Sequence, residues 1–161
     1  MYRHRPLRAR WAGMLACLCT STLLAAPYGA NPPQVRDHDG IAYISGGIGS
    51  DEAGQLRAMA SRFNVHMRFV DARTGESMSD VAVVVVDTQG KKRLSLVTEG
   101  PLLYLKLHPG TYRAYVTYQG STQARPFTAG SKPVALAFRL AVNEAERSWL
   151  YCASQCTRSQ R

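Results

Sequence analysis

The chain has 161 residues, a length typical of one domain, and it carries a formal net charge of +9 at pH 7. Four arginines lie before residue 11, and without residues 1–30, which hold no acidic residue, the formal charge is +5. This charge is moderate, and the basic cluster of Lys91, Lys92 and Arg93 has no aromatic residues interleaved with it. Nucleic acid is therefore not expected as a partner, because nucleic acid requires a dense basic face.

Residues 1–30 are predicted to form a secretory signal peptide. A basic start at residues 1–10 is followed by an uncharged, mostly apolar run over residues 11–26 and by the small-residue stretch APYGA. This order is typical of a signal peptide, and an apolar run of about 15 residues is short for a membrane span, which needs roughly 20. No transmembrane helix is expected after signal removal, and the protein is expected to be periplasmic or secreted.

The signal cleavage position is open between Ala26 and Ala30, since each is a small residue at the end of the apolar run. Two alternatives to a cleaved signal are kept. The sequence MLAC at residues 14–17 is weakly similar to a lipoprotein cleavage box, and the apolar run can also act as an uncleaved N-terminal anchor.

The next two segments differ in character. Residues 31–45 are rich in Pro, Gly, Asp and Asn and are expected to form a flexible leader, in which residues 41–45 are either a short strand or an apolar anchor. Residues 46–63 are expected to contain a short helix over about residues 51–62. Ser50 followed by two acidic residues is typical of a helix start. Apolar residues then repeat at three-to-four spacing, at Ala53, Leu56, Met59 or Ala60, and Phe63.

From residue 64 onward the hydrophobic period changes to two, with turn signals about every 10 residues. This pattern predicts a mainly β chain, a β-sandwich of seven strands over residues 64–142. The valine run within residues 80–87 indicates a strand covered on both faces. Pro126 indicates an edge strand. The seven predicted strands are 64–71, 80–87, 93–98, 102–107, 111–118, 122–129 and 133–142.

The C-terminal tail, residues 143–161, is either helical or a loop and holds the last two cysteines, Cys152 and Cys156. Cys17 and Cys19 lie in the predicted signal peptide. Outside the cytosol two remaining cysteines usually pair, so a small structural disulfide between Cys152 and Cys156 is expected. Intermolecular pairing or a free thiol pair are the alternatives, and a redox motif is not favoured because it has two intervening residues rather than three.

The middle of the chain carries a family resemblance. The turn DARTGES, the valine-rich strand, a hairpin at Gln89 and Gly90, and LHPGTY at residues 107–112 follow one another. This succession resembles the transthyretin-like, or carboxypeptidase regulatory-like, domain, in which Leu-x-Pro-Gly-x-Tyr leads into an alternating strand that closes on a glycine. The resemblance covers about residues 64–142 and implies a seven-stranded transthyretin-like β-sandwich. Residues 46–59 look like the lead-in of small exported bacterial proteins built of little besides this domain.

The Pro109-Gly110 pair is expected to form a type II turn, because proline fixes φ and glycine accepts a positive φ. Such a turn is structural. The resembled domain is attached to many proteins as a binding or structural accessory, so the resemblance implies a fold more than a function. A non-catalytic interaction or structural role in the periplasm or cell envelope is therefore the leading expectation.

An enzymatic alternative rests on hydroxyisourate hydrolases, which share the transthyretin fold and use a first-strand His, an Arg, a second His and a C-terminal Tyr-Arg-Gly-Ser. His66 and the YQGS of residues 118–121 match this in part. However, His66 lies five residues before Asp71 rather than three, and Arg68 takes the matching place. Gln119 replaces an arginine, which removes a charge that a carboxamide cannot supply. The chain is therefore expected not to be an enzyme.

Two further sets of side chains were considered as sites. His38, His66 and His108 show no metal-ligand spacing, so no metal and no cofactor are expected. On the strand at residues 111–118, Tyr112 and Tyr118 are predicted to face the core. The opposite face is predicted to be an exposed binding surface for an envelope protein or a glycan. If the partner is a glycan, the chain is a carbohydrate- or peptidoglycan-binding module, which is the alternative to the leading expectation. The residues of that surface are Tyr115, Arg113 and Thr117.

Overall fold

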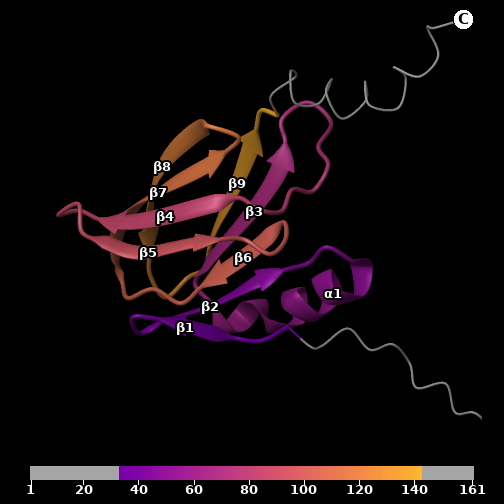
Figure 1. The fold of residues 1–161 in the computed structure, drawn as a ribbon. Helices are drawn as coiled ribbons and strands as arrows, with labels where there is room; N and C mark the ends of the chain where they lie inside the picture. Colours follow the sequence, from indigo (N-terminus) through magenta and orange to yellow (C-terminus); the bar gives the residue numbers. More distant parts are fainter. Residues whose placement is uncertain (1–32, 143–161) are drawn as a thin grey trace, which may run out of the picture.

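A computed structural model describes residues 33–142 of the chain (Figure 1). The predicted signal peptide, the tail and the Cys152–Cys156 pair lie outside the described residues. Within residues 33–142 there is no helix long and apolar enough to cross a membrane. This part of the chain is mainly β, with one α-helix, α1 (Ser50–Met59), which continues into a 3-10 turn, η1 (Ala60–Arg62). The strands are β1 (Arg36–His38), β2 (Ile41–Gly46), β3 (Val65–Asp71), β4 (Ala82–Asp87), β5 (Lys92–Val97), β6 (Leu102–Leu105), β7 (Gly110–Tyr118), β8 (Ser121–Ala129) and β9 (Val134–Leu140).

The strands form two sheets. A five-stranded sheet has the order β1-β2-β6-β3-β9, and a four-stranded sheet has the order β5-β4-β7-β8. Each of the seven predicted strands corresponds to one of β3 to β9. The prediction of seven strands in all was wrong, because the described residues contain nine.

The two additional strands form a hairpin where a flexible leader was expected. β1 pairs with β2 from Arg36↔Tyr43 to His38↔Ile41. Asp39 and Gly40 connect them with φ values of 51° and 78°, the left-handed conformation that both central residues of a type I′ turn require. Ile41 and Ile44 of β2 are buried, so the hairpin is anchored to the rest of the fold by apolar packing.

The inner faces of both sheets share one hydrophobic core. β7 alternates, with Tyr112, Ala114 and Val116 buried between the sheets. They pack with the inward residues of the other strands, including Phe69 and Phe138, whose rings stack at 5.8 Å between centroids. The alternation of buried and exposed positions follows from the period of two along a strand. The two sheets therefore enclose a sandwich-like core.

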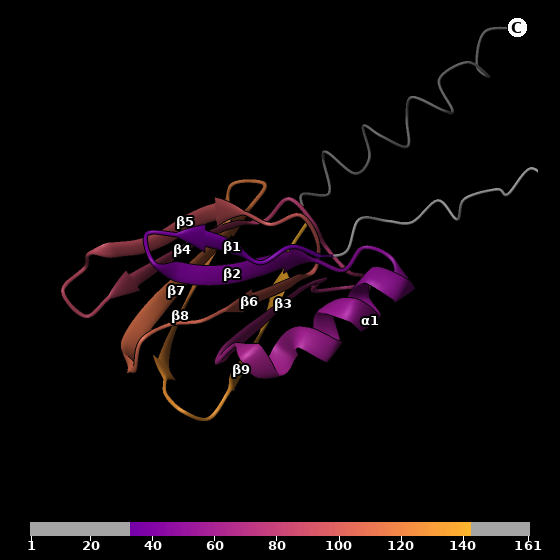
Figure 2. The same ribbon diagram turned by 90° about the horizontal axis from the view of Figure 1, so that it is seen from below.

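Helix α1 covers part of the outer face of the five-stranded sheet. Ala53 and Leu56 of the helix, with Phe63 just after η1, pack in a second cluster with Ile44, Leu102 and Tyr104. Figure 2 shows β2, β6 and β3 between α1 and the four-stranded sheet. The helix begins at Ser50, one residue before the predicted start, with Gly49 at the cap position, and Glu52 accepts a hydrogen bond from the Ile48 N–H at 3.1 Å. The outer side of the β2–β6 pair is therefore occupied by this chain itself.

The reversal between β6 and β7 differs from the predicted type II turn. Gly110 has no positive φ and already belongs to β7, where it pairs with Ala129. The Tyr112 hydroxyl donates a hydrogen bond to His108 O at 3.1 Å, which holds the segment before Pro109 against the strand. Positive φ occurs instead at Gln119 and Gly120, with 46° and 78°. They are the two central residues of the β7–β8 hairpin, so the YQGS sequence connects two strands.

Candidate functional site: the outer face of the four-stranded sheet

The predicted binding residues lie on the outer face of the four-stranded sheet. On β7, Arg113 is exposed and Tyr115 and Thr117 are half-buried, while their neighbours at 112, 114 and 116 point into the core. Thr117 and Thr122 bring their hydroxyl oxygens to 2.8 Å across the β7–β8 pair. The structure thus places the three predicted residues side by side along one strand.

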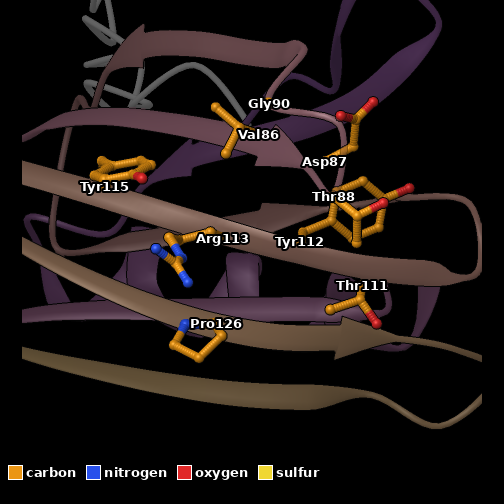
Figure 3. A pocket seen from close by; sticks show the side chains of 9 residues that line it. All are labelled: Val86, Asp87, Thr88, Gly90, Thr111, Tyr112, Arg113, Tyr115 and Pro126. Carbon is orange, nitrogen blue, oxygen red and sulfur yellow. The ribbon is translucent and has the colours of Figure 1, made fainter.

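A hollow of about 390 Å³ lies on this face (Figure 3). Its residues come from β4, from the turn after it, and from β7 and β8. Arg113 and Tyr115 line the hollow, whereas Thr117 lies beyond it. The lining residues are Val86, Asp87, Thr88, Gly90, Thr111, Tyr112, Arg113, Tyr115 and Pro126.

The sheet register arranges the outer side chains in rows across the strands. Arg113 is opposite Val86 on β4 and opposite Pro126 on β8. Figure 3 shows the Arg113 side chain extending toward Pro126. The next row places Tyr115 between Val84 and Ala124. Each cation or ring on β7 is therefore flanked by apolar side chains from the neighbouring strands.

The outer face of β4 is more open than its sequence predicts. The valine run in β4 was expected to be covered on both faces, but only one of its faces is. Val83 and Val85 are fully buried, whereas Val84 and Val86 are half-buried on the outer face. Val97 on β5, which is opposite Ala82, is 60% exposed. Among the described residues nothing covers this face, in contrast to the β2–β6 face beneath α1.

Two charged side chains line the hollow, the basic Arg113 and the acidic Asp87. The Arg113 side chain forms no ion pair or hydrogen bond with another described residue. Asp87 lines the hollow, but its Oδ1 accepts hydrogen bonds from the N–H groups of Gln89 at 3.0 Å and Lys91 at 2.9 Å. The carboxylate is thus engaged in holding the β4–β5 turn. The Arg113 guanidinium remains available to an anionic group.

A β-bulge adds a second cation to the row of Arg113. Leu94 on β5 is opposite Val85, and after a register shift Lys92 is opposite Val86. Arg93 is the extra residue of the bulge, which lets Lys92 share the face of Val86. Lys92 is exposed and Arg93 is half-buried. Sequence reasoning identified these residues as a basic cluster beside a turn but did not relate them to Arg113, because a bulge cannot be read from hydrophobic period.

A second hollow, of about 360 Å³, lies on the outer face of the five-stranded sheet beside α1. It brings together His66 and Arg68, two of the residues weighed for the hydrolase alternative, while His108 is absent from its lining. His66 was expected to face outward, and its side chain does lie outside the core. However, η1 and the segment after it cover one side of its ring. Its Nε2 lies 3.0 Å from Ala60 O and 3.2 Å from Phe63 O, so a proton on Nε2 is donated toward these carbonyls.

The His66 ring also contacts Tyr104, with 4.6 Å between the ring centroids. Burial raises the pKa of the Tyr104 hydroxyl above its ordinary value, and the nearby Arg57 acts in the opposite direction. Both effects follow from Tyr104 lying under the helix. Tyr104 is therefore held in its neutral form next to two arginines that line the same hollow, Arg57 and Arg68.

The three histidines considered as metal ligands are distributed over different elements. His38 ends β1, 4.0 Å from Asp39, His66 lies on β3 and His108 precedes β7. Over residues 33–142 no group of three or more His, Cys, Asp and Glu side chains is arranged to hold a metal ion. A scan against protein-family models and a search of the curated proteins found no match to this chain.

Proposed function

We propose that the chain is an exported, non-catalytic interaction module of transthyretin-like architecture that works in the periplasm or at the cell envelope. The observation that carries this proposal is the uncovered outer face of β4, β7 and β8. That face combines the half-buried Val84 and Val86, the Tyr115 ring and an unpaired Arg113, and it has a hollow lined by Val86, Tyr115 and Arg113. An apolar sheet face with an aromatic residue and an arginine at its centre has the composition of an interaction surface.

The architecture supports the transthyretin-like part of the proposal in two ways. Two sheets enclose one core, and the seven strands from β3 to β9 fall in the region that carries the resemblance. The export part rests on the signal-like residues 1–30. The mature N-terminus of the protein, determined by mass spectrometry from an envelope fraction, checks it. A start after residue 26 or 30 is expected, and an intact Met1 in the cytosolic fraction contradicts export.

A carbohydrate-binding role is the second candidate, and one local observation favours it. The half-buried Tyr115 ring lies one row from the Thr117–Thr122 hydroxyl pair. A ring that stacks on a sugar, beside hydroxyls that hydrogen-bond to it, is a suitable arrangement for a glycan. The hydrolase alternative has less support, since His66 and Arg68 share a hollow that His108 does not line.

A photo-crosslinking experiment in the envelope tests the interaction face. A photoreactive residue replaces Val84 or Thr117 on the outer face, and in a control it replaces Lys132, which is exposed in the β8–β9 turn. Adducts are expected from positions 84 and 117, and they should disappear when Tyr115→Ala is added. Equal labelling from position 132, or adducts that persist without the Tyr115 ring, would overturn the assignment of the face.

A further inference from the structure

We propose that the ligand of this outer face is an acidic glycan, with a sugar ring on Tyr115 and a carboxylate on Arg113. The inference rests on the proposed function and names its ligand class. It follows from four properties of the face. These are the unpaired guanidinium of Arg113, the position of Lys92, the ring and hydroxyl groups around Tyr115, and the pairing of the backbone groups of β4 and β7.

Arg113 is a cation in apolar surroundings without a partner. Val86 and Pro126 flank it, and the nearest acidic residue in the hollow, Asp87, is engaged with the N–H groups of its own turn. A guanidinium presents its donors in a planar fork that fits a carboxylate, and Arg113 has no such partner among the described residues. An anionic group on the ligand is therefore the natural complement of Arg113.

Lys92 extends the positive charge in one direction across the sheet. Lys92 and Arg113 are opposite Val86 from its two sides, so their strands are two spacings, roughly 10 Å, apart. Neither residue forms an ion pair with another described residue. A ligand that repeats its anionic group can therefore meet both cations, whereas a single small anion can meet only one.

The neutral end of the face supplies contacts suited to a sugar. Tyr115 is one row from Arg113, and Thr117 is one row further along the same face. Tyr115 is half-buried and lies between Val84 and Ala124 in the sheet register. Stacking on the ring and hydrogen bonds from the Thr117 and Thr122 hydroxyls complement a polyhydroxylated ring.

The backbone distinguishes a glycan from an acidic peptide. β4 pairs with both β5 and β7, and β7 pairs with both β4 and β8, so the ladders use their backbone groups. A peptide that binds a sheet usually adds a strand at an edge, where main-chain groups are free. The centre of this face offers side-chain contacts only. A ligand rich in hydroxyl groups and carboxylates fits these contacts better than an extended peptide.

Binding of the mature protein to immobilised polygalacturonate, a polymer of a carboxylated sugar, tests the inference, with dextran as the neutral polymer. Binding to polygalacturonate but not to dextran is expected, and it should weaken as salt is raised. Arg113→Gln should weaken it about tenfold, since a charge-assisted hydrogen bond contributes about that much. Tyr115→Leu should weaken it as well. Arg139→Gln, on β9 of the other sheet, is the matched control and should bind as the unmodified protein does, with circular dichroism confirming the fold of each variant.

Two outcomes overturn the inference, and both leave the proposed function standing. Equal binding to dextran, unaffected by Arg113→Gln, would show a glycan site without acid specificity. Absence of binding to both polymers, together with protein adducts from positions 84 and 117 in the crosslinking experiment, would show a polypeptide partner. The proposed function itself would fail on a different result, namely crosslinking that is as strong from position 132 as from positions 84 and 117.

Discussion

The Asn64 carboxamide and the backbone of Leu107 exchange two hydrogen bonds. Asn64 Nδ2 donates to Leu107 O at 2.8 Å, and Asn64 Oδ1 accepts from Leu107 N at 2.9 Å. The side chain thus acts as a peptide group and continues the β3–β6 pairing by one step. Nδ2 also donates to Gly130 O at 3.0 Å, which ties the β8–β9 turn to the same point. Asn64 is buried, so these bonds form away from water.

Replacement of Asn64 should be strongly destabilising. Asn64→Ala leaves Leu107 N, Leu107 O and Gly130 O without this partner, and a loss of about 3 kcal/mol in unfolding free energy is expected. Asn64→Asp should lose at least as much at neutral pH, because a carboxylate faces two carbonyl oxygens, and should recover partly at acidic pH, when protonation restores one donor. Urea denaturation measures both. Gln89→Ala, at an exposed turn position, is the control. A change below about 0.5 kcal/mol for Asn64→Ala would contradict the role of the side chain.

Gly100 and Gly110 should respond oppositely to alanine. A Cβ at Gly100 would lie 2.4 Å from both the carbonyl carbon and the oxygen of Gly46, which are backbone atoms that cannot move aside. A Cβ at Gly110 would lie 3.5 Å from the Tyr112 ring, an ordinary contact. Gly100→Ala should therefore cost about 2 kcal/mol or more, and Gly110→Ala should lie within about 1 kcal/mol of the unmodified protein. Thermal and urea unfolding of the pair give the comparison, and similar values for both variants would refute it.

Pro126 should protect the β8 edge against pairing with another chain. Counting from the two-residue hairpin at Gln119-Gly120, Arg113↔Pro126 is a pair without ladder hydrogen bonds, so the Pro126 nitrogen points to the free edge. Because proline has no N–H, that edge lacks a donor at this position. Pro126→Thr should leave the monomer's unfolding free energy nearly unchanged and should increase self-association, measured by light scattering against concentration. Ala124→Thr introduces the same side chain without adding a backbone N–H and serves as the control. A monomeric Pro126→Thr protein at every concentration would argue against protection by the proline.

Tyr104 should make the fold sensitive to alkaline pH. Burial raises the pKa of its hydroxyl in the folded protein above the ordinary value of 10.0. The folded state therefore holds this proton more tightly than the unfolded state. The resulting stability is present below about pH 10 and is lost as pH rises through the folded pKa. The melting temperature should fall more steeply above about pH 10 for the unmodified protein than for Tyr104→Phe. Tyr118→Phe controls for the removal of a phenol. If the melting temperatures of the unmodified protein and Tyr104→Phe fall equally with pH, the prediction is wrong.

Hydrophobic period was sufficient to predict β3 to β9 and the orientation of β7. Tyr112 and Tyr115 fall on opposite faces as predicted, because one side of the strand meets the core and the other does not. The β1–β2 hairpin was missed because polar residues dominate its first strand. Its signal was nevertheless present in Asp39-Gly40, the dipeptide that favours a two-residue hairpin.

The site was less predictable than the fold. The alternation of side chains along β7 predicted that Arg113 and Tyr115 lie on the outer face. Lys92 joins this face because of a bulge, and a bulge depends on how the strands pair in the folded protein. The valines of β4 form a continuous run, so their sequence does not distinguish a doubly covered strand from a strand with one open face. The Pro109-Gly110 pair was misjudged for a similar reason. Glycine permits a positive φ but does not require it, and here the β7–β8 ladder imposes an extended conformation on Gly110.

The parallel pairing of β3 with β9 has a consequence for the order of folding. Val65 pairs with Val134 and Asp71 with Leu140, so β3 takes its second neighbour from the last strand of the described residues. A nascent chain that has not yet reached residue 134 leaves β3 with an open edge and Phe69 without the ring of Phe138. Pairings of such long sequence separation form late and slowly. The domain should therefore stay unfolded until nearly all of it has been made, which is the condition in which a chain can be threaded through a secretion channel.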